Sequence, residues 1–455
     1  MREIEVGEKK SIGIGLMGLG VVGGGVAKTL LEKDRTIAEE IGCPSVLKKI
    51  LVREPSKPRS LAIDQHLLTV DPQEILTDPE IRIVIEVIGG EHPALAYIEQ
   101  ALLSGKSVVT ANKEVISKHG LKLLGIAQQK GVDLLYEASV GGGIPLLLPL
   151  RQGLLVNEIS AIHAIINGTT NYILTKMSAE GVSFAAALRQ AQELGYAEAD
   201  ATNDIEGIDA AYKLAILATA AFHCNVCPED VYCQGITRLA ERDFRYAKEL
   251  GYEIKLLAIA KKGNGSIEVR VHPAFIPMDF LLAKVGGVYN AIQIEGDLVG
   301  KVLFYGEGAG SLPTSSAIIA DVIAAAKNIM QGKEVGTREL PPESENVSPA
   351  TSSSFPVRTV KPISELETRY YLRMSIADAP GVLAQIAKSL GDRSISIFSA
   401  IQKEADAATQ TAEIVIITHP AREQFMQQAL EEMEKLPVVK EISNFIRVEG
   451  QVIMK

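Results

Sequence analysis

Two ionisable side chains, Asp209 and Lys213, stand four residues apart in a mostly apolar segment. Positions i and i+4 share one face of a helix, so the carboxylate and the ammonium can meet. Ala211, Leu214 and Ala215 lie beside the lysine and predict a buried amine. Burial lowers the pKa of a lysine while a neighbouring carboxylate raises it, and a lysine with a lowered pKa can shuttle a proton. On spacing alone, the alternative is a helix salt bridge that contributes about 0.3–0.5 kcal/mol.

A glycine-rich turn, Gly18-Leu19-Gly20-Val21-Val22-Gly23, follows an apolar run and precedes an amphipathic segment. This spacing between a strand and a helix is typical of dinucleotide binding. Gly18 permits a tight turn, Gly20 lets the backbone approach a pyrophosphate, and Gly23 allows the helix to pack closely on the strand. The amides of the helix N-terminus then face the phosphates. We therefore expect these six residues to bind a dinucleotide.

The residues after the second predicted strand bear on which dinucleotide fits. Sites that prefer NAD place an acidic residue about 20 positions beyond the glycines, on the ribose 2′-hydroxyl. Here the strand ends in Arg53-Glu54, and Lys57 and Arg59 follow. Such basic groups suit a 2′-phosphate, although a basic loop is also common on a solvated surface. The sequence favours NADP, with Arg53 and Lys57 as ligands, and Glu54 leaves NAD open.

Four further turns contain polar or flexible residues between apolar stretches. Thr110-Ala-Asn-Lys113 follows a predicted sheet strand, where ligand crevices of α/β sheets form. The other three turns are residues 137–145, 167–171 and 195–204. We expect Thr110 and Lys113 to lie at the cofactor.

Alternating strands and helices position these turns through about residue 136. Nearly continuous apolar runs are typical of strands in a parallel sheet that is covered on both faces. The alternation predicts a Rossmann-type, doubly wound α/β unit. The predicted strands are residues 11–16, 49–53, 81–88, 107–110 and 132–136, and the predicted helices are residues 21–40, 93–104 and 116–130.

From about residue 150 the pattern changes to an inserted α+β region for substrate binding and dimerisation. A Gly263-Asn264-Gly265 turn predicts a hairpin, and helix 315–330 is expected to return to the first domain. The predicted strands are residues 158–166, 255–261, 267–273, 289–296 and 300–306, and the predicted helices are residues 171–177, 183–194 and 205–223.

The C-terminal part follows a segment rich in proline and serine, which indicates a linker. Beyond it the pattern is β-α-β-β-α-β, the ferredoxin-like order, over residues 370–376, 382–390, 395–402, 411–418, 421–435 and 438–447. The predicted domains are 1–150 with helix 315–330, then 151–314, the linker 331–369, and 370–455.

The composition excludes some classes of protein. The chain of 455 residues has 46 basic and 56 acidic side chains, a net charge of −10, whereas nucleic-acid binders need clustered positive charge. We also predict no membrane segment, because no apolar run reaches about 18 residues. The charged residues 1–10 do not resemble a signal peptide, so we expect a cytoplasmic protein.

Three of the four cysteines lie close together in the sequence. Cys224 and Cys227 have CxxC spacing, Cys233 follows, and Cys43 stands apart. A zinc site needs further ligands at suitable spacing, and neither a second CxxC nor a well-spaced histidine is present. We interpret these thiols as small packing residues.

Long stretches of the chain resemble homoserine dehydrogenase, in the monofunctional form with a C-terminal ACT domain. The block 193–217 is the most specific of them, and together they cover almost the whole catalytic region in order. The matching stretches are residues 18–26, 110–113, 137–145, 166–174, 193–217 and 308–314.

The resemblance implies reversible NAD(P)-dependent interconversion of L-homoserine and L-aspartate 4-semialdehyde, in threonine, methionine and isoleucine biosynthesis. Lys213 matches the family's proton donor and acceptor, Asp209 its partner, and Lys113 the lysine between nicotinamide and substrate. Glu198 matches the carboxylate that holds the substrate's amino group, and Asp204 is a second candidate for this role or for structural support.

Further sites are implied by the same resemblance. A monovalent cation, Na⁺ or K⁺, is expected at main-chain oxygens of Glu137, Val140, Gly142 and Ile144. Gly195 and Gly310 match further glycines that contact the cofactor, with ordinary turn glycines as the alternative.

The C-terminal module resembles an ACT domain through the turn from Asp378 to Gly381 and the strand after residue 395. ACT domains bind small amino acids at paired interfaces, so L-threonine is the implied effector; a purely structural or dimerising role is the alternative. We expect a homodimer or homotetramer. Two other functions stay open: another amino-acid or semialdehyde dehydrogenase on this scaffold, and a non-catalytic sensor of dinucleotide and amino acid.

Overall fold

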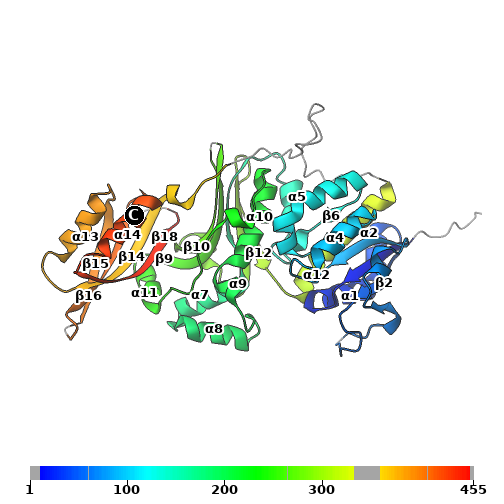
Figure 1. Cartoon of the computed structure of the whole chain (residues 1–455), viewed down its shortest axis with the longest axis horizontal. Coiled ribbons are helices and arrows are strands. Elements are labelled where there is room, and N and C mark those ends of the chain that lie inside the picture. Colours follow the sequence, from blue (N-terminus) through cyan, green and yellow to red (C-terminus); the bar gives the residue numbers. More distant parts are fainter. Residues whose placement is uncertain (1–10, 60, 264, 333–358, 407, 451–455) are drawn as a thin grey trace, which may run out of the picture.

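The molecule is an elongated row of three parts in sequence order (Figure 1). The computed structural model describes residues 11–59, 61–263, 265–332, 359–406 and 408–450. The charged segment 1–10 and most of the predicted linker, residues 333–358, lie outside the described residues. Within the described chain, no helix combines the length and apolarity needed to cross a bilayer.

The first part is a parallel six-stranded sheet in the order β3-β2-β1-β4-β5-β6. This order is that of the Rossmann fold, so the prediction of a doubly wound sheet is confirmed. Every residue of β1 is buried, as expected for a strand with helices on both faces. The strands are β1 (Ile12–Met17), β2 (Ser45–Leu51), β3 (Leu68–Thr69), β4 (Ile81–Glu86), β5 (Ser107–Thr110) and β6 (Leu134–Leu135).

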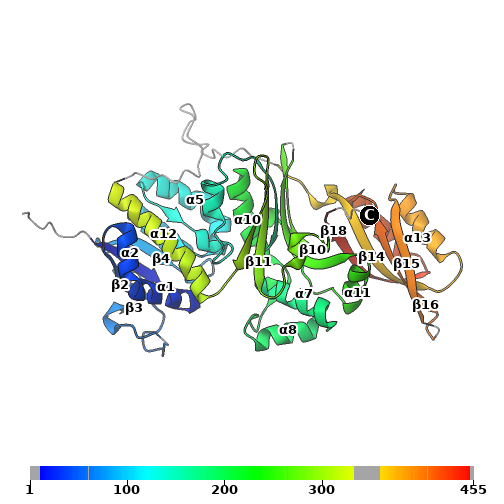
Figure 2. The same cartoon turned by 180° about the vertical axis from the view of Figure 1, so that it is seen from behind.

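Helices cover both faces of this sheet. One face packs on α3 (Gln73–Leu76), α4 (Ala94–Leu103) and α5 (Lys113–Lys130). The other face packs on α1 (Val21–Glu32), α2 (Asp34–Ile41) and α12 (Ser311–Gln331), the last arriving from far along the chain (Figure 2).

The predicted helix 21–40 is two helices, because Lys33 leaves the helical conformation. The break lets Ile37 and Ile41 of α2 join the same apolar core as Leu30 of α1. No glycine or proline marks this break in the sequence, so tertiary packing determines it.

The middle part is built on an antiparallel sheet in the order β12-β11-β7-β9-β10. Its strands are β7 (Ile159–Ile165), β9 (Tyr252–Lys262), β10 (Ser266–Pro277), β11 (Tyr289–Gly296) and β12 (Gly300–Glu307). The predicted hairpin is β9–β10, although Asn264 itself lies outside the described residues. One face packs on helices, which are α6 (Leu147–Arg151), α7 (Gly168–Glu180), α8 (Phe184–Glu193), α9 (Thr202–Ile205), α10 (Ile208–Phe222) and α11 (Glu241–Glu249).

The predicted helix 205–223 begins later, because Gly207 separates α9 from α10. Gly207 has φ +83°, a left-handed conformation that ends one helix and redirects the chain. A side chain there would meet Cys233 Sγ at 3.0 Å and Val271 Cγ1 at 3.1 Å. The start of the helix that carries Asp209 and Lys213 is therefore set by close packing at Gly207, the residue before it.

The C-terminal part has the predicted β-α-β-β-α-β order, with one additional two-residue strand, β17, where the second helix is predicted to begin. Its elements are β14 (Glu367–Ala377), α13 (Val382–Gly391), β15 (Ile397–Asp406), β16 (Thr411–Thr418), β17 (Ala421–Arg422), α14 (Glu423–Met433) and β18 (Val439–Val448). The end of the predicted linker is ordered: β13 (Thr359–Val360) pairs with β10, and β14 begins before residue 370.

The middle and C-terminal parts share one sheet, because β18 pairs in parallel with β10 at Ala274–Arg447 and Phe275–Val448. The sequence predicts separate domains joined by a flexible linker. The difference arises because strand pairing between distant segments satisfies backbone groups that each part alone would leave at an edge.

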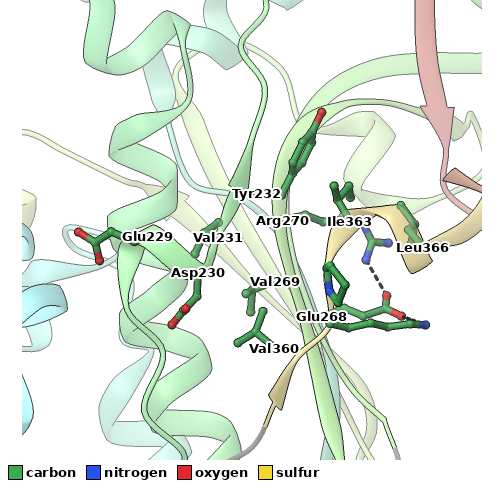
Figure 3. A pocket seen from close by; sticks show the side chains of 12 residues that line it. Glu229, Asp230, Val231, Tyr232, Glu268, Val269, Arg270, Val360, Ile363 and Leu366 are labelled. Atoms are coloured by element: carbon green, nitrogen blue, oxygen red, sulfur yellow. Dashed lines mark hydrogen bonds and ion pairs between the residues drawn. The ribbon is translucent and has the colours of Figure 1, made fainter. Parts of the chain in front are cut away.

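A small pocket lies at this junction (Figure 3). It has a volume of about 290 Å³ and is bounded by β8 (Tyr232–Cys233), β10 and the segment 360–366. Arg270 and Lys361 both contact Glu268 beside it, at 2.8 and 3.2 Å. None of the residues predicted to bind substrate or cofactor lines this pocket.

The three cysteines that lie close together in the sequence differ in their surroundings. Cys224 is buried, Cys227 is half-buried and Cys233 is exposed, and all are free thiols. Among the described residues, no group of three or more His, Cys, Asp or Glu side chains is arranged to hold a metal ion. Cys224 is a buried packing residue, as predicted. Cys233 is exposed instead, and its Sγ lies 3.1 Å from the carbonyl oxygen of Glu206.

Candidate active site

A buried carboxylate, that of Asp209, lies between two lysines. Lys213 Nζ donates to Asp209 Oδ2 at 2.7 Å, and the ammonium of Lys113 forms an ion pair with Oδ1 of the same group. Asp209 and Lys213 are on α10 with the predicted i,i+4 spacing, whereas Lys113 is the first residue of α5. The site therefore forms where the carboxyl edge of the nucleotide-type sheet meets the helix layer of the middle part.

Solvent access differs between the three side chains. Side-chain exposure is 5% for Asp209, 12% for Lys213 and 41% for Lys113. Lys113 is thus the member of the cluster most open to a ligand that approaches along the sheet edge.

Burial and charge displace the pKa values in different directions. For Lys213, burial lowers the pKa and Asp209 raises it, and the net displacement is downward. Burial raises the pKa of Asp209, but Lys213 and Lys113 lower it by a larger amount, so the carboxylate stays ionised. Burial lowers the pKa of Lys113 and Asp209 raises it, with a net increase. The two lysines differ: Lys113 holds its proton, and Lys213 releases one more easily.

Asn167 is a site residue that we did not single out from the sequence. Its Nδ2 donates to Asp209 Oδ2 at 2.9 Å and to Asp204 Oδ1 at 2.7 Å. The preceding carbonyl, that of Ile166, accepts from Lys213 Nζ at 2.9 Å. The sequence predicts this helix from residue 171, whereas α7 begins at Gly168, directly after Asn167. Asparagine is a favoured N-cap residue, a signal that could have located Asn167 but not its contacts.

The acidic residues expected to hold a substrate amino group take different positions. Asp204 is half-buried and bound to Asn167, next to the lysines. Glu198 is exposed on the loop between α8 and α9, and its backbone carbonyl accepts from Gln192 Nε2 at 3.2 Å. The loop is tied to the start of α7 by Thr169 Oγ1, which donates to the carbonyl of Tyr196 at 2.6 Å. The structure thus brings Asp204 into the cluster and leaves the carboxylate of Glu198 in solvent.

The glycine turn has the shape that a dinucleotide needs. Gly18 has φ +103°, and a Cβ on Gly23 would lie 2.1 Å from the carbonyl oxygen of Gly18. A Cβ on Gly20 would meet no described atom within 4 Å, so the space in front of it is open. Gly20 caps α1, and within the described chain no side chain accepts from the amides of its first turn. These open amides fit a pyrophosphate.

The basic loop after β2 lies at the same edge of the sheet, because β2 and β1 are parallel neighbours. Arg53 and Lys57 are exposed there. Arg59 is bound within its own loop: its guanidinium donates to the carbonyls of Glu54, Pro55 and Lys57. Arg59 therefore orders the loop.

Three other residues expected at the cofactor differ in their surroundings. Thr110 is buried and its hydroxyl donates to Glu86 Oε2 at 2.7 Å, so only its backbone can face a ligand. Gly310 caps α12, and the next residue, Ser311, donates through Oγ to the carbonyl of Val21 at 2.8 Å. Gly310 thus adjoins the glycine turn. Gly195 has φ +75° at an exposed turn after α8.

The loop expected to bind a monovalent cation is a tight turn with left-handed Gly141 and Gly142. The carboxylate of Glu137 accepts the amides of residues 146–148 at 2.5, 2.8 and 2.7 Å. These bonds occupy the side chain, so a cation in this loop would depend on main-chain oxygens, as expected for Val140, Gly142 and Ile144.

The turn expected to bind an effector precedes α13. Gly381 has φ +85° and caps this helix. Asp378 is exposed, and Gln402 Nε2 approaches its Oδ1 at 3.4 Å. The turn connects β14 to α13, and Gln402 reaches it from β15.

Three family descriptions match the chain in order. Residues 18–137 match the NAD-binding domain of homoserine dehydrogenase, residues 145–323 match homoserine dehydrogenase, and residues 370–438 match the ACT domain.

Curated relatives extend over nearly the whole chain. The homoserine dehydrogenase of Synechocystis is 43% identical over 443 residues, covering 96% of this chain and 99% of that protein. That of Bacillus subtilis is 38% identical over 441 residues, covering 97% and 99%.

Solved structures agree with this assignment. The homoserine dehydrogenase from Thiobacillus denitrificans superposes with a TM-score of 0.88 at 41% identity, covering 97% of this chain and 99% of that one. The S. aureus enzyme at pH 8.5 gives 0.74 at 33% identity, covering 97% and 100%. The Rossmann domain, the catalytic domain and the ACT domain all have counterparts in order, and the chain belongs to the homoserine dehydrogenase family.

Proposed function

We propose that Lys213 is the proton donor and acceptor in the interconversion of L-homoserine and L-aspartate 4-semialdehyde, with Asp209 as its partner and Lys113 beside the reacting groups. The observation that carries the proposal is the buried carboxylate of Asp209, bound by lysines from two different elements. Of the two lysines, only Lys213 has a pKa lowered by its surroundings.

In the oxidation of homoserine, the neutral amine of Lys213 takes the hydroxyl proton while Asp209 and the carbonyl of Ile166 hold that amine in place. In the reverse direction the ammonium returns the proton to the developing alkoxide. Lys113 remains charged and stabilises negative charge on the substrate oxygen. When bound, the nicotinamide dinucleotide accepts or supplies the hydride.

A substrate that is also an amino acid needs an anionic partner for its ammonium. We propose Glu198 and Asp204 for this role. Glu198 is exposed on a loop that Thr169 fastens to α7, and Asp204 is the half-buried acid nearest the lysines.

For the cofactor, we propose NADP in preference to NAD, with the turn 18–23, the backbone of Thr110, and Gly195 and Gly310 around it. Arg53 and Lys57 are exposed at the edge that the glycine turn also faces, and this placement supports contact with a 2′-phosphate. A hyperthermophilic archaeal homoserine dehydrogenase, 29% identical and covering 69% of this chain, is known in complex with NADPH.

Changing Arg53 to Ala tests the cofactor preference. The KM for NADP should rise about 10- to 100-fold, because a charge-assisted hydrogen bond contributes about 1.5–3 kcal/mol, while the KM for NAD stays unchanged. Steady-state rates with both cofactors measure this difference. Lys33→Ala, at the end of α1 opposite to the glycine turn, serves as a charge-matched control. Equal effects on both cofactors would remove Arg53 from the phosphate site.

The proposal also covers the cation site, the effector, the assembly and the domain boundaries. We propose a monovalent cation at the main-chain oxygens of residues 137, 140, 142 and 144, and L-threonine as effector at the Asp378–Gly381 turn. We further propose a cytoplasmic homodimer or homotetramer, with domains divided at 1–150 with 315–330, 151–314 and 370–455.

Lys213→Ala tests the catalytic proposal directly. We expect kcat for homoserine oxidation to fall by about two to four orders of magnitude, the usual contribution of a positioned acid or base. Cofactor affinity, measured by fluorescence titration with NADPH, should not change. Unaltered turnover would exclude Lys213 from the proton transfer, and absence of any activity in the unmodified protein would contradict the assigned reaction itself.

A further inference from the structure

The carboxamide of Asn167 joins three elements at the buried end of the active site. Asn167 follows β7 and caps α7, where its Oδ1 accepts from the amide of Thr170 at 2.8 Å. Its Nδ2 donates to Asp204 of α9 and to Asp209 of α10. The residue is only 5% exposed. Both amide hydrogens and the oxygen are therefore engaged, which fixes the orientation of the side chain.

Ile166 and Asn167, the two residues that follow β7, contact both members of the Asp209–Lys213 pair. The carbonyl of Ile166 accepts from the Lys213 ammonium, and Asn167 donates to the carboxylate. Lys213 Nζ and Asn167 Nδ2 bind the same oxygen, Oδ2 of Asp209. Asn167 is thus placed to limit how strongly this oxygen can attract the proton-bearing amine.

We infer that Asn167 is a positioning residue for the reaction: it holds the carboxylate of Asp209 between Lys113 and Lys213 and moderates the charge that Lys213 meets. The inference rests on the proposed role of Lys213. A neutral donor stabilises the buried anion without adding a second cation to it, and so leaves the amine able to lose its proton.

Three charged groups, from three different helices, face Lys213. Asp209 lies on its own helix, Lys113 comes from α5 and Asp204 from α9. Asp209 and Asp204 favour the charged amine, while Lys113 and burial disfavour it. A further negative charge at position 167 would add to the first group and raise the pKa of Lys213.

Asn167→Asp separates positioning from helix capping. Aspartate caps a helix as well as asparagine does, so the bond from the Thr170 amide is kept. An ionised aspartate cannot donate to Asp204 or Asp209. We expect the rise of kcat with pH in homoserine oxidation to move up by about one pH unit or more, since this direction needs the neutral amine of Lys213. At neutral pH, kcat should fall about tenfold per unit of that shift.

Two variants accompany this experiment. Asn167→Ser keeps a capping oxygen, adds no charge and should shift the profile in the same direction by less. Asn171→Asp makes the matched change one turn further along α7, where the buried amide bonds to the carbonyl of Tyr289 and contacts Lys255. This control should keep the profile of the unmodified protein. NADPH titration and thermal unfolding of each variant establish that it is folded.

The possible outcomes are distinct. A shift to higher pH in Asn167→Asp, smaller in Asn167→Ser and absent in Asn171→Asp, supports the inference. A uniform loss of kcat with an unmoved profile, or an equal shift in Asn171→Asp, overturns it. If Asn167→Asp does not fold, Asn167→Ser alone decides by the presence or absence of its shift. Failure of the proposed function would appear separately, as an unmodified protein that does not oxidise homoserine or a Lys213→Ala variant with full turnover.

Discussion

At the scale of single residues, Asp209 is the centre of the site. Both of its carboxylate oxygens are bound, one by Lys113 and the other by Lys213 and Asn167. A buried carboxylate with fewer partners would take up a proton, because burial raises its pKa. Here the cations lower the pKa of Asp209 well below its ordinary value. Its constant negative charge is what counteracts the effect of burial on Lys213.

Asp209→Asn removes this charge and keeps the size of the side chain. Asp209 raises the pKa of Lys213, while burial and Lys113 lower it. Without the carboxylate the pKa of Lys213 should fall further, so the rise of kcat for homoserine oxidation moves to lower pH. We also expect kcat to fall about 10- to 100-fold, because the amine loses the group that orients it. A pH–rate profile measures both effects, and a shift to higher pH would contradict the assigned electrostatics.

At the scale of elements, the turn between β1 and α1 separates two uses of glycine. Gly23 is required by the protein itself, because a Cβ would collide with the carbonyl oxygen of Gly18. Gly20 faces open space, so only a ligand would exclude a side chain there. The same motif thus contains one glycine for packing and one for binding.

Alanine substitutions distinguish these uses. Gly23→Ala should lower the melting temperature and weaken NADPH binding together. Gly20→Ala should leave the melting temperature unchanged and raise the Kd for NADPH. Gly24→Ala, also without a neighbour within 4 Å, is the control and should stabilise α1 by up to about 1 kcal/mol without changing affinity. Thermal unfolding and fluorescence titration provide the two readouts, and unchanged affinity in Gly20→Ala would argue against the pyrophosphate site.

At the scale of the whole molecule, buried ion pairs fasten the ACT domain to the catalytic domain. Arg373 of β14 contacts Asp243 of the α11 region at 2.7 Å and Glu413 of β16 at 3.1 Å. Arg447 of β18 reaches Gln234 and Tyr232 of the middle part at 2.7 and 3.1 Å. With the shared sheet, these contacts make the two domains one packed unit along β10 and β18.

Arg373→Met removes one partner of such a buried pair. Asp243 would lose the cation that faces its buried charge, whereas Glu413 keeps Arg242 at 3.1 Å. We expect a loss of about 3–5 kcal/mol in the free energy of unfolding. Lys388→Met is the control, since Lys388 and Asp392 form an exposed pair whose loss should change stability by less than about 0.5 kcal/mol. Urea unfolding compares the two variants. Equal effects would show that the junction does not depend on Arg373.

Local patterns in the sequence determined most of the secondary structure and the position of the main site residues. The glycine turn, the alternating elements and the Asp209–Lys213 spacing depend on neighbours within a few residues, where steric limits and helical periodicity act directly. Three features depended on the tertiary structure: the ion pair from Lys113 to Asp209, the bridge through Asn167, and the pairing of β10 with β18. Each joins segments that are far apart in the chain. No local pattern records such contacts, because they form only when the packing of the whole core brings those segments together.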